Sequence, residues 1–355
     1  MVFYGTLISG VHTMIREYLK LSRSFNAVLT GISPVMGAIA MEQYNIVFLF
    51  LLFLVGFLGH SFGFVFNDII DYKLDKTAKE IQDRPLISGT ITLRNAWIYA
   101  LGCMIFAFGI GFFIALMTSL YLPLVILAFS AFFIALYDLI SKKLPFMDIL
   151  VALGVFFLIL YGALYGYNQG QPASSLGDVT LLAWIVCILG SIQVLFMQMI
   201  AGGLKDIKND FEKGARTTAI KLGVRMADGK LHVSLPFKIL AYAIQLVDIG
   251  TVFLPFFIVW NITNITFLHY GQWILLLVIS VAMLYLSYGL LSMTRFERKK
   301  ARMYIGTHYM TNFMLVPVML MTLNPWAGIL MFFPFLGFIL NNLVLHGTLL
   351  QPKTM

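Results

Sequence analysis

The sequence predicts an all-α membrane protein, built as a bundle of nine to ten transmembrane helices with a further helix at the membrane surface. Of the 355 residues, 60% are hydrophobic and only 11% are charged, whereas soluble domains carry about 25% charged residues. The mean hydropathy is correspondingly high, at +0.89. The apolar residues also gather in ten segments, most of them about long enough to cross a bilayer. No part of the chain has the composition of a separate soluble domain.

The first segment, residues 1–23, is expected to lie along the membrane surface. It begins with apolar residues but lacks the basic start and small-residue cleavage site of a signal peptide. Three basic residues follow, Arg16, Lys20 and Arg23. Apolar residues combined with basic ones are typical of an interfacial amphipathic helix, which we place at residues 4–22. Residues 24–355 are expected to form one transmembrane domain.

Ten apolar segments are candidate spans. They lie at residues 25–42, 46–67, 96–117, 119–140, 147–168, 180–204, 236–260, 272–293, 303–323 and 326–348. Only the turn Leu323–Asn324–Pro325 separates the last two segments, so nine spans with one broken helix is the alternative.

The basic residues orient this bundle. With these spans, all 24 Lys and Arg residues fall at one end, while the opposite loops carry little charge apart from Glu42 and Asp178. Basic loops favour the cytoplasmic side, so we expect this end to be cytoplasmic. The net charge of +8 therefore reflects topology, and basic residues spread over short loops do not indicate a nucleic-acid surface. Cys103 and Cys187 lie within apolar segments and indicate neither a disulfide framework nor a zinc site.

The end of the second span carries the first functional candidate, F-N-D-I-I-D-Y-K-L-D, which starts at Phe66. At 100° per residue, Asp68, Asp71 and Asp75 fall within roughly 60° of one another on a helix, with Asn67 beside them. Like charges on one face repel, so we expect these carboxylates to share a cation.

A second acidic pair, Asp206 and Asp210, closes the sixth span at the same end of the bundle. Its offset of four residues places both carboxylates on one helix face. Two such clusters could hold Mg²⁺, which usually binds through a few carboxylates plus substrate phosphates. Metal there would neutralise charge on a departing diphosphate and assist cleavage of the adjoining carbon–oxygen bond. A diphosphate above an apolar bundle indicates a lipid tail between the helices, hence a prenyl diphosphate.

These motifs resemble those of the UbiA superfamily of intramembrane prenyltransferases. The family's first motif, N-D-x-x-D-x-x-x-D, is matched from Asn67 to Asp75, and its second, D-x-x-x-D, is matched by the pair at 206 and 210. The stretch D-R-P-L-I-S-G-T-I, which contains Arg84, is similar to the family's R-P-x-x-x-G-x-I. R-S-F-N, ending at Asn26, is similar to R-P-x-N, with Ser24 in place of proline. The resemblance covers roughly residues 20–295.

The resemblance implies a fold, a site and a cofactor. The fold would be a bundle around a central cavity that opens sideways, with the last one or two spans as an extension. The implied catalytic residues are Asp68, Asp71, Asp206 and Asp210. The implied ligands of Mg²⁺ are these four and Asp75. The implied substrate-binding residues are Asn67, Asp75, Arg84, Tyr137, Lys142, Lys143 and Asn26.

The reaction implied by the resemblance is metal-assisted ionisation of an allylic diphosphate to a delocalised carbocation. An aromatic ring carbon or a hydroxyl of the acceptor then captures the cation. The spans are rich in Phe and Tyr, whose ring faces stabilise a cation by about 0.5–2 kcal/mol each. Dry walls would also keep water from quenching it.

Two acceptor classes fit the sequence. The second motif and the residues after it, K-D-I-K-N-D-F-E-K-G-A-R-T-T-A-I-K-L-G, resemble the menaquinone type. Tyr137 with Lys142 or Lys143, after the fourth span, resembles a Tyr-and-Lys element of the family and looks more like the ether-lipid type. We favour an aromatic quinone precursor, with geranylgeranylglyceryl phosphate of archaeal ether-lipid synthesis as the alternative. The expected partners are a prenyl diphosphate, one of these acceptors and the lipid bilayer, with no nucleic acid and no obligatory protein partner.

Other interpretations of the acidic residues predict different placements. An ion- or proton-coupled transporter also carries intramembrane carboxylates, but transport sites lie near the bilayer midplane and these lie at helix ends. A non-catalytic scaffold would not need two matched clusters. His60, seven residues before Asn67, is an ionisable residue inside a span; we expect a neutral histidine that is hydrogen-bonded to a neighbouring helix.

Overall fold

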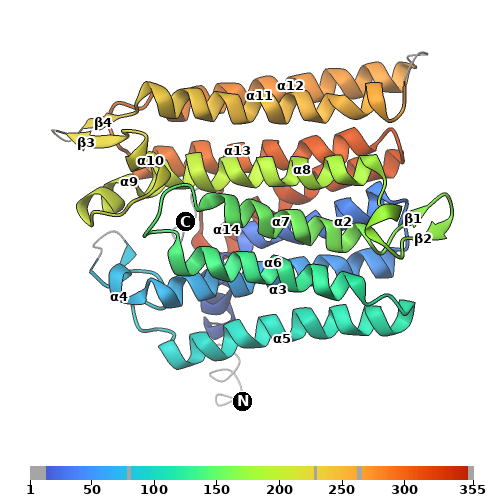
Figure 1. Cartoon of the computed structure of the whole chain (residues 1–355). Coiled ribbons are helices and arrows are strands. Elements are labelled where there is room, and N and C mark those ends of the chain that lie inside the picture. Colours follow the sequence, from blue (N-terminus) through green and yellow to red (C-terminus); the bar gives the residue numbers. More distant parts are fainter. Residues whose placement is uncertain (1–12, 78–80, 228–229, 262–265, 351–355) are drawn as a thin grey trace, which may run out of the picture.

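The computed structural model describes residues 13–77, 81–227, 230–261 and 266–350, and these are mostly helical. The long helices run side by side (Figure 1). Within the described ranges, seven helical segments are long and apolar enough to cross a bilayer. They are α3 (Ile46–Ile70), α5 (Leu93–Thr118), α6 (Leu122–Ile140), the continuous run of α8 (Leu181–Leu195), η3 (Phe196–Gly202) and α9 (Gly203–Glu212), α11 (Leu235–Ile258), α12 (Phe267–Leu291), and η4 (Pro325–Met331) with α14 (Phe332–His346).

Helices occupy all ten predicted spans, but three of them fall outside this group of seven. α2 (Ser24–Ala40) and α7 (Asp148–Ala163) are apolar but have only 17 and 16 residues. α13 (Arg298–Leu320) begins with charged residues. The all-helical membrane bundle is confirmed, while the count of nine or ten crossings stays a prediction.

Polar residues mark where several helices start. The Asn45 side chain accepts hydrogen bonds from the Val47 and Phe48 amides at the start of α3, both at 3.1 Å. Thr92 caps α5 in the same way, with a bond of 3.2 Å from the Asn95 amide. Such caps satisfy amides that have no partner within the helix.

Short elements join the helices at the two ends of the bundle. They are α4 (Tyr72–Asp75), α10 (Thr218–Lys221), η2 (Leu176–Asp178), and the antiparallel pairs β1 (Tyr167–Asn168) with β2 (Gln171–Pro172) and β3 (Arg225–Ala227) with β4 (Lys230–His232). Figure 1 shows α4, α9, α10 and the β3–β4 pair together at the left end, and β1–β2 at the right end. Both acidic motifs therefore lie at one end, as the charge pattern predicts. That this end is cytoplasmic stays a prediction.

The helix α2 is buried along almost its whole length because small residues let its neighbours approach closely. A Cβ atom added to Gly56 of α3 would come within 2.6 Å of the Thr30 carbonyl of α2. One added to Gly162 of α7 would overlap the Pro34 carbonyl. In lipid, close packing of this kind replaces the hydrophobic driving force between helices. α2 consequently becomes an inner wall from which side chains reach the centre of the bundle.

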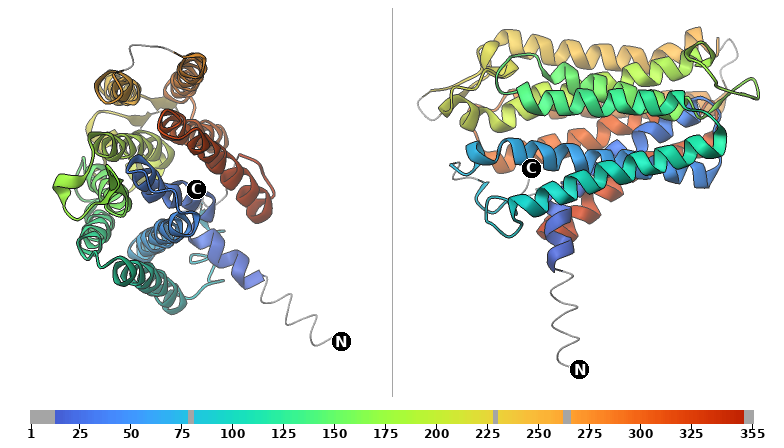
Figure 2. Two further views of the ribbon diagram at one scale, coloured as in Figure 1. Left: turned by 90° about the vertical axis from the view of Figure 1, so that its right-hand side faces the viewer. Right: turned by 60° about the horizontal axis from the view of Figure 1, so that its bottom comes forward.

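Residues 13–21 are helical and leave the bundle sideways (Figures 1 and 2). The Tyr18 ring packs on the Tyr99 ring of α5, with centroids 4.9 Å apart, and Arg16 donates to the Leu345 carbonyl at 2.8 Å. The orientation fits a helix lying in the membrane interface, which stays a prediction, and residues 4–12 of the predicted helix lie outside the described residues.

The last helix, α14, packs on α2. The Phe25 and Phe338 rings meet edge to face, with centroids 5.6 Å apart, and Gly337 leaves room for Val28. The C-terminal extension is therefore an integral part of the described bundle.

Candidate active site

The first acidic motif follows α3 into α4. Asn67 and Asp68 lie in the last turn of α3, Asp71 follows that helix, and Asp75 ends α4. The Asp71 amide donates to the Asn67 carbonyl (2.9 Å) and the Asp75 amide to the Asp71 carbonyl (2.8 Å), so helical spacing continues through the motif. This spacing turns Asn67, Asp71 and Asp75 toward one cavity.

Asp68 takes a different position within the same motif. Its Oδ1 atom accepts a hydrogen bond from Nη2 of Arg23 at 2.8 Å and lies 3.6 Å from Nη1 of Arg84. The side chain is buried and is not among the described residues that line the cavity. Asp68 thus anchors two arginines, and its role as a direct metal ligand stays a prediction.

The second acidic motif comes from the long helix α8–η3–α9. The middle part, η3, is a π-helix of seven residues, a rare geometry that is frequent at functional sites. Asp206 and Asp210 follow in α9, and both line the same cavity as the first motif. The Asp206 side chain is 39% exposed, whereas Asp210 is buried. The structure therefore brings together two carboxylate pairs that are far apart in the sequence.

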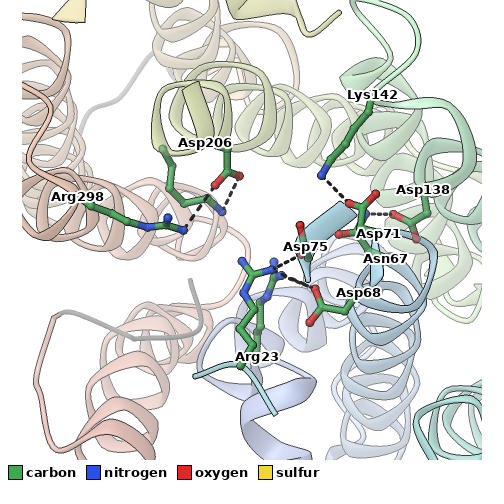
Figure 3. A network of polar contacts seen from close by, with 11 residues as sticks. Arg23, Asn67, Asp68, Asp71, Asp75, Asp138, Lys142, Asp206 and Arg298 are labelled. Carbon is green, nitrogen blue, oxygen red and sulfur yellow. Dashed lines mark hydrogen bonds and ion pairs between the residues drawn. The ribbon is translucent and has the colours of Figure 1, made fainter. Parts of the chain in front are cut away.

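Each pair meets cationic side chains (Figure 3). Lys142 Nζ lies 2.8 Å from Asp71 Oδ2, and Arg84 Nη1 lies 2.9 Å from Asp75 Oδ2. At the second motif, Lys205 Nζ is 3.4 Å from Asp206 Oδ2 and Arg298 Nη2 is 3.8 Å from Asp206 Oδ1. The cavity mouth is therefore a network of alternating charges.

Burial affects the ionisation of the Asp71–Lys142 pair. Burial raises the pKa of Asp71 above its ordinary value, although Lys142 opposes this, and Asp75 and Asp68 add to it. For Lys142 burial is the largest single effect and lowers the pKa, but Asp71, Asp75 and Asp210 together raise it by more, so the net pKa is above its usual value. Lys142 therefore stays protonated, and its positive charge favours the ionised form of Asp71.

The other predicted substrate residues differ in position. Asn67 donates to Asp138 Oδ1 at 3.1 Å. Asn26, Arg84 and Tyr137 line the cavity, as does Lys142. Lys143, by contrast, is exposed and does not line it among the described residues. Of Lys142 and Lys143, only Lys142 lines the cavity among the described residues, and its contact with substrate stays a prediction.

The replacement of proline by Ser24 in the R-S-F-N stretch does not disturb the start of α2, which begins at this residue. The hydrogen bond expected between His60 and a neighbouring helix is present, because its Nδ1 atom and the Thr30 hydroxyl of α2 lie 2.8 Å apart; the neutral state of His60 stays a prediction.

Sequence reasoning missed several polar residues of the cavity, among them Asp138, Asp148 and Arg298. Asp138 follows Tyr137 directly, and Asp148 begins α7 and accepts a hydrogen bond from the Thr218 hydroxyl at 3.0 Å. Arg298 begins α13. The local signal was present in Y-D-L-I-S-K-K and R-F-E-R-K-K, but charged residues at basic helix ends are common, and only the packing shows which of them face inward.

The cavity has a volume of about 640 Å³. Its lining comes from helices of most of the chain, including α2, α3, α5, α6, α7, α9 and α13. Polar residues surround one end, while Val55, Leu127, Val151 and Leu158 line it further inside. This arrangement suits an amphiphile with an anionic head and an apolar chain.

The carboxylates fit a magnesium site in which the protein supplies only some of the ligands. Asp71, Asp75, Asp206 and Asp210 offer hard oxygen ligands around the cavity. However, no three acidic, His or Cys side chains in the described ranges stand close enough to enclose an ion. These residues therefore fit an ion whose coordination shell is completed by water and by the phosphates of a substrate, which is the usual way in which proteins bind Mg²⁺.

Known proteins share both the sequence pattern and the fold. A model of the UbiA prenyltransferase family matches residues 28–313. Digeranylgeranylglyceryl phosphate synthase of Methanobrevibacter smithii is 28% identical over 284 residues, which is 80% of this chain and 89% of the relative.

Two solved structures have the same fold. The apo structure of a UbiA homologue from Aeropyrum pernix K1 gives a TM-score of 0.63 at 16% identity, covering 84% of this chain and 97% of that one. A UbiA homologue from Archaeoglobus fulgidus bound to GPP and Mg²⁺ gives 0.57 at 12% identity, covering 84% and 99%. Because the family model matches most of the chain, this protein belongs to the UbiA prenyltransferase family.

Proposed function

We propose that this protein is a Mg²⁺-dependent prenyltransferase that moves a polyprenyl group from its diphosphate to the hydroxyl of a glyceryl phosphate lipid. The observation that carries the proposal is that both carboxylate pairs line the same cavity. They lie at its polar end, and apolar side chains line it further inside. The Archaeoglobus fulgidus homologue with GPP and Mg²⁺ supports the donor and the ion. The name of the Methanobrevibacter smithii relative supports the acceptor, so we now prefer this acceptor to the aromatic one.

The aspartates would hold the ion together with the donor. Asp71 and Asp75 approach from one side and Asp206 from the other (Figure 3), and Asp210, four residues further along α9, also lines the cavity. When bound, Mg²⁺ neutralises the diphosphate and stabilises it as it leaves. Asp68, buried beside Arg23 and Arg84, keeps those arginines at the site.

Metal loading would also change the partners of the cations. Lys142 pairs with Asp71, and Lys205 and Arg298 pair with Asp206. A carboxylate that turns to the metal releases its cation, which is then available to phosphate oxygens. Arginine and lysine are the residues that bind such oxygens best. The same charges would thus hold the site together before the ion binds and would bind anions afterwards.

The inner part of the cavity would protect the cation formed from the prenyl chain. The bond between the chain and the diphosphate oxygen breaks, and both electrons leave with the diphosphate. The acceptor hydroxyl forms the new carbon–oxygen bond, and its proton passes to the departing diphosphate. Apolar walls exclude water that would otherwise capture the cation.

The test uses the full chain in lipid nanodiscs with geranylgeranyl diphosphate. Geranylgeranylglyceryl phosphate and 4-hydroxybenzoate are offered as competing acceptors, and mass spectrometry identifies the product while diphosphate release is measured. We expect the ether lipid to be the product and its formation to depend on Mg²⁺. In Asp206→Asn the rate of diphosphate release should fall at least about 100-fold, since removing a transition-state charge contact costs several kcal/mol.

Glu42→Gln, an exposed acidic residue of the opposite end, is the matched control and should keep its activity. Prenylation of the aromatic acceptor alone would refute the proposed acceptor. Absence of any Mg²⁺-dependent turnover would refute the proposed reaction.

A further inference from the structure

The loop between α6 and α7, residues 141–147, carries Lys142. In Figure 3 the Lys142 side chain points to Asp71, and its Nζ atom lies 2.8 Å from Asp71 Oδ2. Burial lowers the pKa of Lys142, but the charges of Asp71, Asp75 and Asp210 raise it by more. Carboxylates of both acidic motifs therefore act on this ammonium group, and the conformation of the loop decides where it lies between them.

Hydrogen bonds join this loop to the chain that follows the second motif. The Arg216 amide donates to the Lys142 carbonyl at 3.2 Å. The Phe146 amide donates to the Thr218 hydroxyl at 2.9 Å, and that hydroxyl donates to Asp148 Oδ2 at 3.0 Å. Both ends of the loop are therefore attached to residues that come shortly after α9.

The Thr218 hydroxyl uses its bonding capacity on these two partners. An amide can only donate, so the hydroxyl accepts from Phe146 and its one hydrogen is left for Asp148. Thr218 is only 2% exposed, so bulk water does not compete for these bonds. Asp148 begins α7. One buried side chain thus joins the end of the loop to the first turn of the next helix.

The loop also contains a backbone conformation that needs outside contacts. Phe146 has a φ of 63°, in the left-handed region that bulky residues rarely adopt. Such a conformation costs free energy and persists only where the surrounding structure determines it. The bond between the Phe146 amide and Thr218 is one of the contacts that do so. Without this bond we expect the loop to relax and to shift Lys142, four residues earlier.

We propose that Thr218 is a positioning residue for the prenyl donor: its hydroxyl holds residues 141–147 against the chain after the second motif and so keeps the Lys142 ammonium where it can bind the diphosphate. The inference rests on the proposed function and adds to it a residue that acts on the diphosphate through Lys142. A cation that is already in place loses less freedom on binding, and such preorganisation improves affinity.

The test is a double-mutant cycle on donor binding. The full chain in nanodiscs is titrated with a non-cleavable thiolo analogue of geranylgeranyl diphosphate at saturating Mg²⁺, and Kd is measured. We expect Thr218→Val, which keeps the shape but removes the hydroxyl, to weaken binding about three- to tenfold, as for the loss of one or two hydrogen bonds. In the Lys142→Met background the same substitution should change Kd less than about twofold, because residues that act through one another are not additive.

Thr218→Ser keeps the hydroxyl and should bind within about twofold of the wild type. Thr118→Val is the matched control, because the Thr118 hydroxyl also donates to one group, the Ile114 carbonyl at 2.9 Å, and accepts from an amide, that of Leu120 at 3.4 Å. Thr118 ends α5 at the opposite end of the bundle (Figure 1), so its substitution should change Kd less than about twofold. If Thr218→Val does not fold, Asp148→Ala, which removes the acceptor of the Thr218 hydroxyl, takes its place in the cycle with the same expected result.

Three results would overturn the inference. The first is an equal loss from Thr218→Val in the wild type and in the Lys142→Met background, which would mean that Thr218, a residue of the cavity lining, acts independently of Lys142. The second is unchanged binding in Thr218→Val, and the third is a loss in Thr218→Ser as large as in Thr218→Val. In all three the wild type still binds the analogue with Mg²⁺, whereas a wild type that does not bind it would contradict the proposed function itself.

Discussion

At the scale of single residues, the Asp71–Lys142 pair connects metal binding with anion binding. Asp71 is a partly buried carboxylate whose pKa is raised by burial, and Lys142, 2.8 Å away, favours its ionised form. In the loaded site the same lysine would turn to a phosphate oxygen. Its neighbour Lys143 has the same charge but is exposed. The two lysines therefore form a natural comparison.

We expect Lys142→Met to lower kcat/KM for the prenyl diphosphate by about 10- to 100-fold, because a charge-assisted contact at a partly buried site is lost. Lys143→Met should change kcat/KM less than about twofold. Diphosphate release under limiting donor measures both variants. Equal effects of the two substitutions would show that general positive charge matters more than the contact with Asp71.

The pH profile of the same variant gives a second readout. A raised pKa means that Asp71 takes up a proton at a higher pH than an ordinary carboxyl group, and a protonated Asp71 cannot hold Mg²⁺. Removing Lys142, which lowers the pKa of Asp71, should raise that pKa further. The acid limb of activity at limiting Mg²⁺ should therefore lie at higher pH in Lys142→Met than in the wild type. An unchanged or lower midpoint would contradict this.

At the scale of elements, the helix α2 determines where the cavity can form. Its Pro34 carbonyl lies against Gly162 of α7, and its Thr30 carbonyl lies near Gly56 of α3. These contacts exist only because the glycines have no side chain. Together they hold α2 close to the cavity, so that Arg23 and Asn26 line it.

We expect Gly162→Ala to destabilise the protein by about 1–3 kcal/mol, since the added methyl group overlaps the Pro34 backbone and forces the helices apart. Gly102→Ala is the matched control, because nothing lies within 4 Å of the position that its methyl group would take on α5. Alanine there should be neutral or stabilising through helix propensity. Thermal unfolding in detergent measures both, and equal melting temperatures would refute close packing at Gly162.

At the scale of the whole molecule, the bundle gathers the charged residues of the cavity at one end, while its described interior is mostly apolar. The long helix α8–η3–α9 and the helices α3 and α13 all bring charged side chains to the same end. The opposite end carries the short β1–β2 pair. A lipid substrate would therefore meet this polar chemistry at one end of the described bundle.

We expect this charged end to face the cytoplasm, as the basic loops predict. Lys299→Cys and Gln171→Cys place exposed thiols at the two ends, while Cys103 and Cys187 are buried. A membrane-impermeant maleimide added to intact cells should label Gln171→Cys only, and Lys299→Cys should react only after the membrane is opened. The reverse pattern would invert the topology.

The amino-acid sequence is enough to predict the helical positions and the end at which the chemistry lies. Backbone groups in lipid must be satisfied within each segment, so long apolar stretches become helices whatever their neighbours are. The N-D-x-x-D-x-x-x-D pattern likewise carries its own spacing, because local helical geometry places Asp71 and Asp75 one turn apart.

Which charged residues meet, by contrast, depends on the packing of the helices. The spacing that groups Asp68 with Asp71 does not reveal that Arg23 and Arg84 bind it. It also does not distinguish Lys142 from Lys143 or bring Arg298 to Asp206. These neighbours come from different helices, and their distances depend on how closely the helices pack and on how each is rotated about its own axis. Those quantities are set by contacts across the whole bundle, such as that between Gly162 and Pro34, and local spacing along the chain contains no information about them.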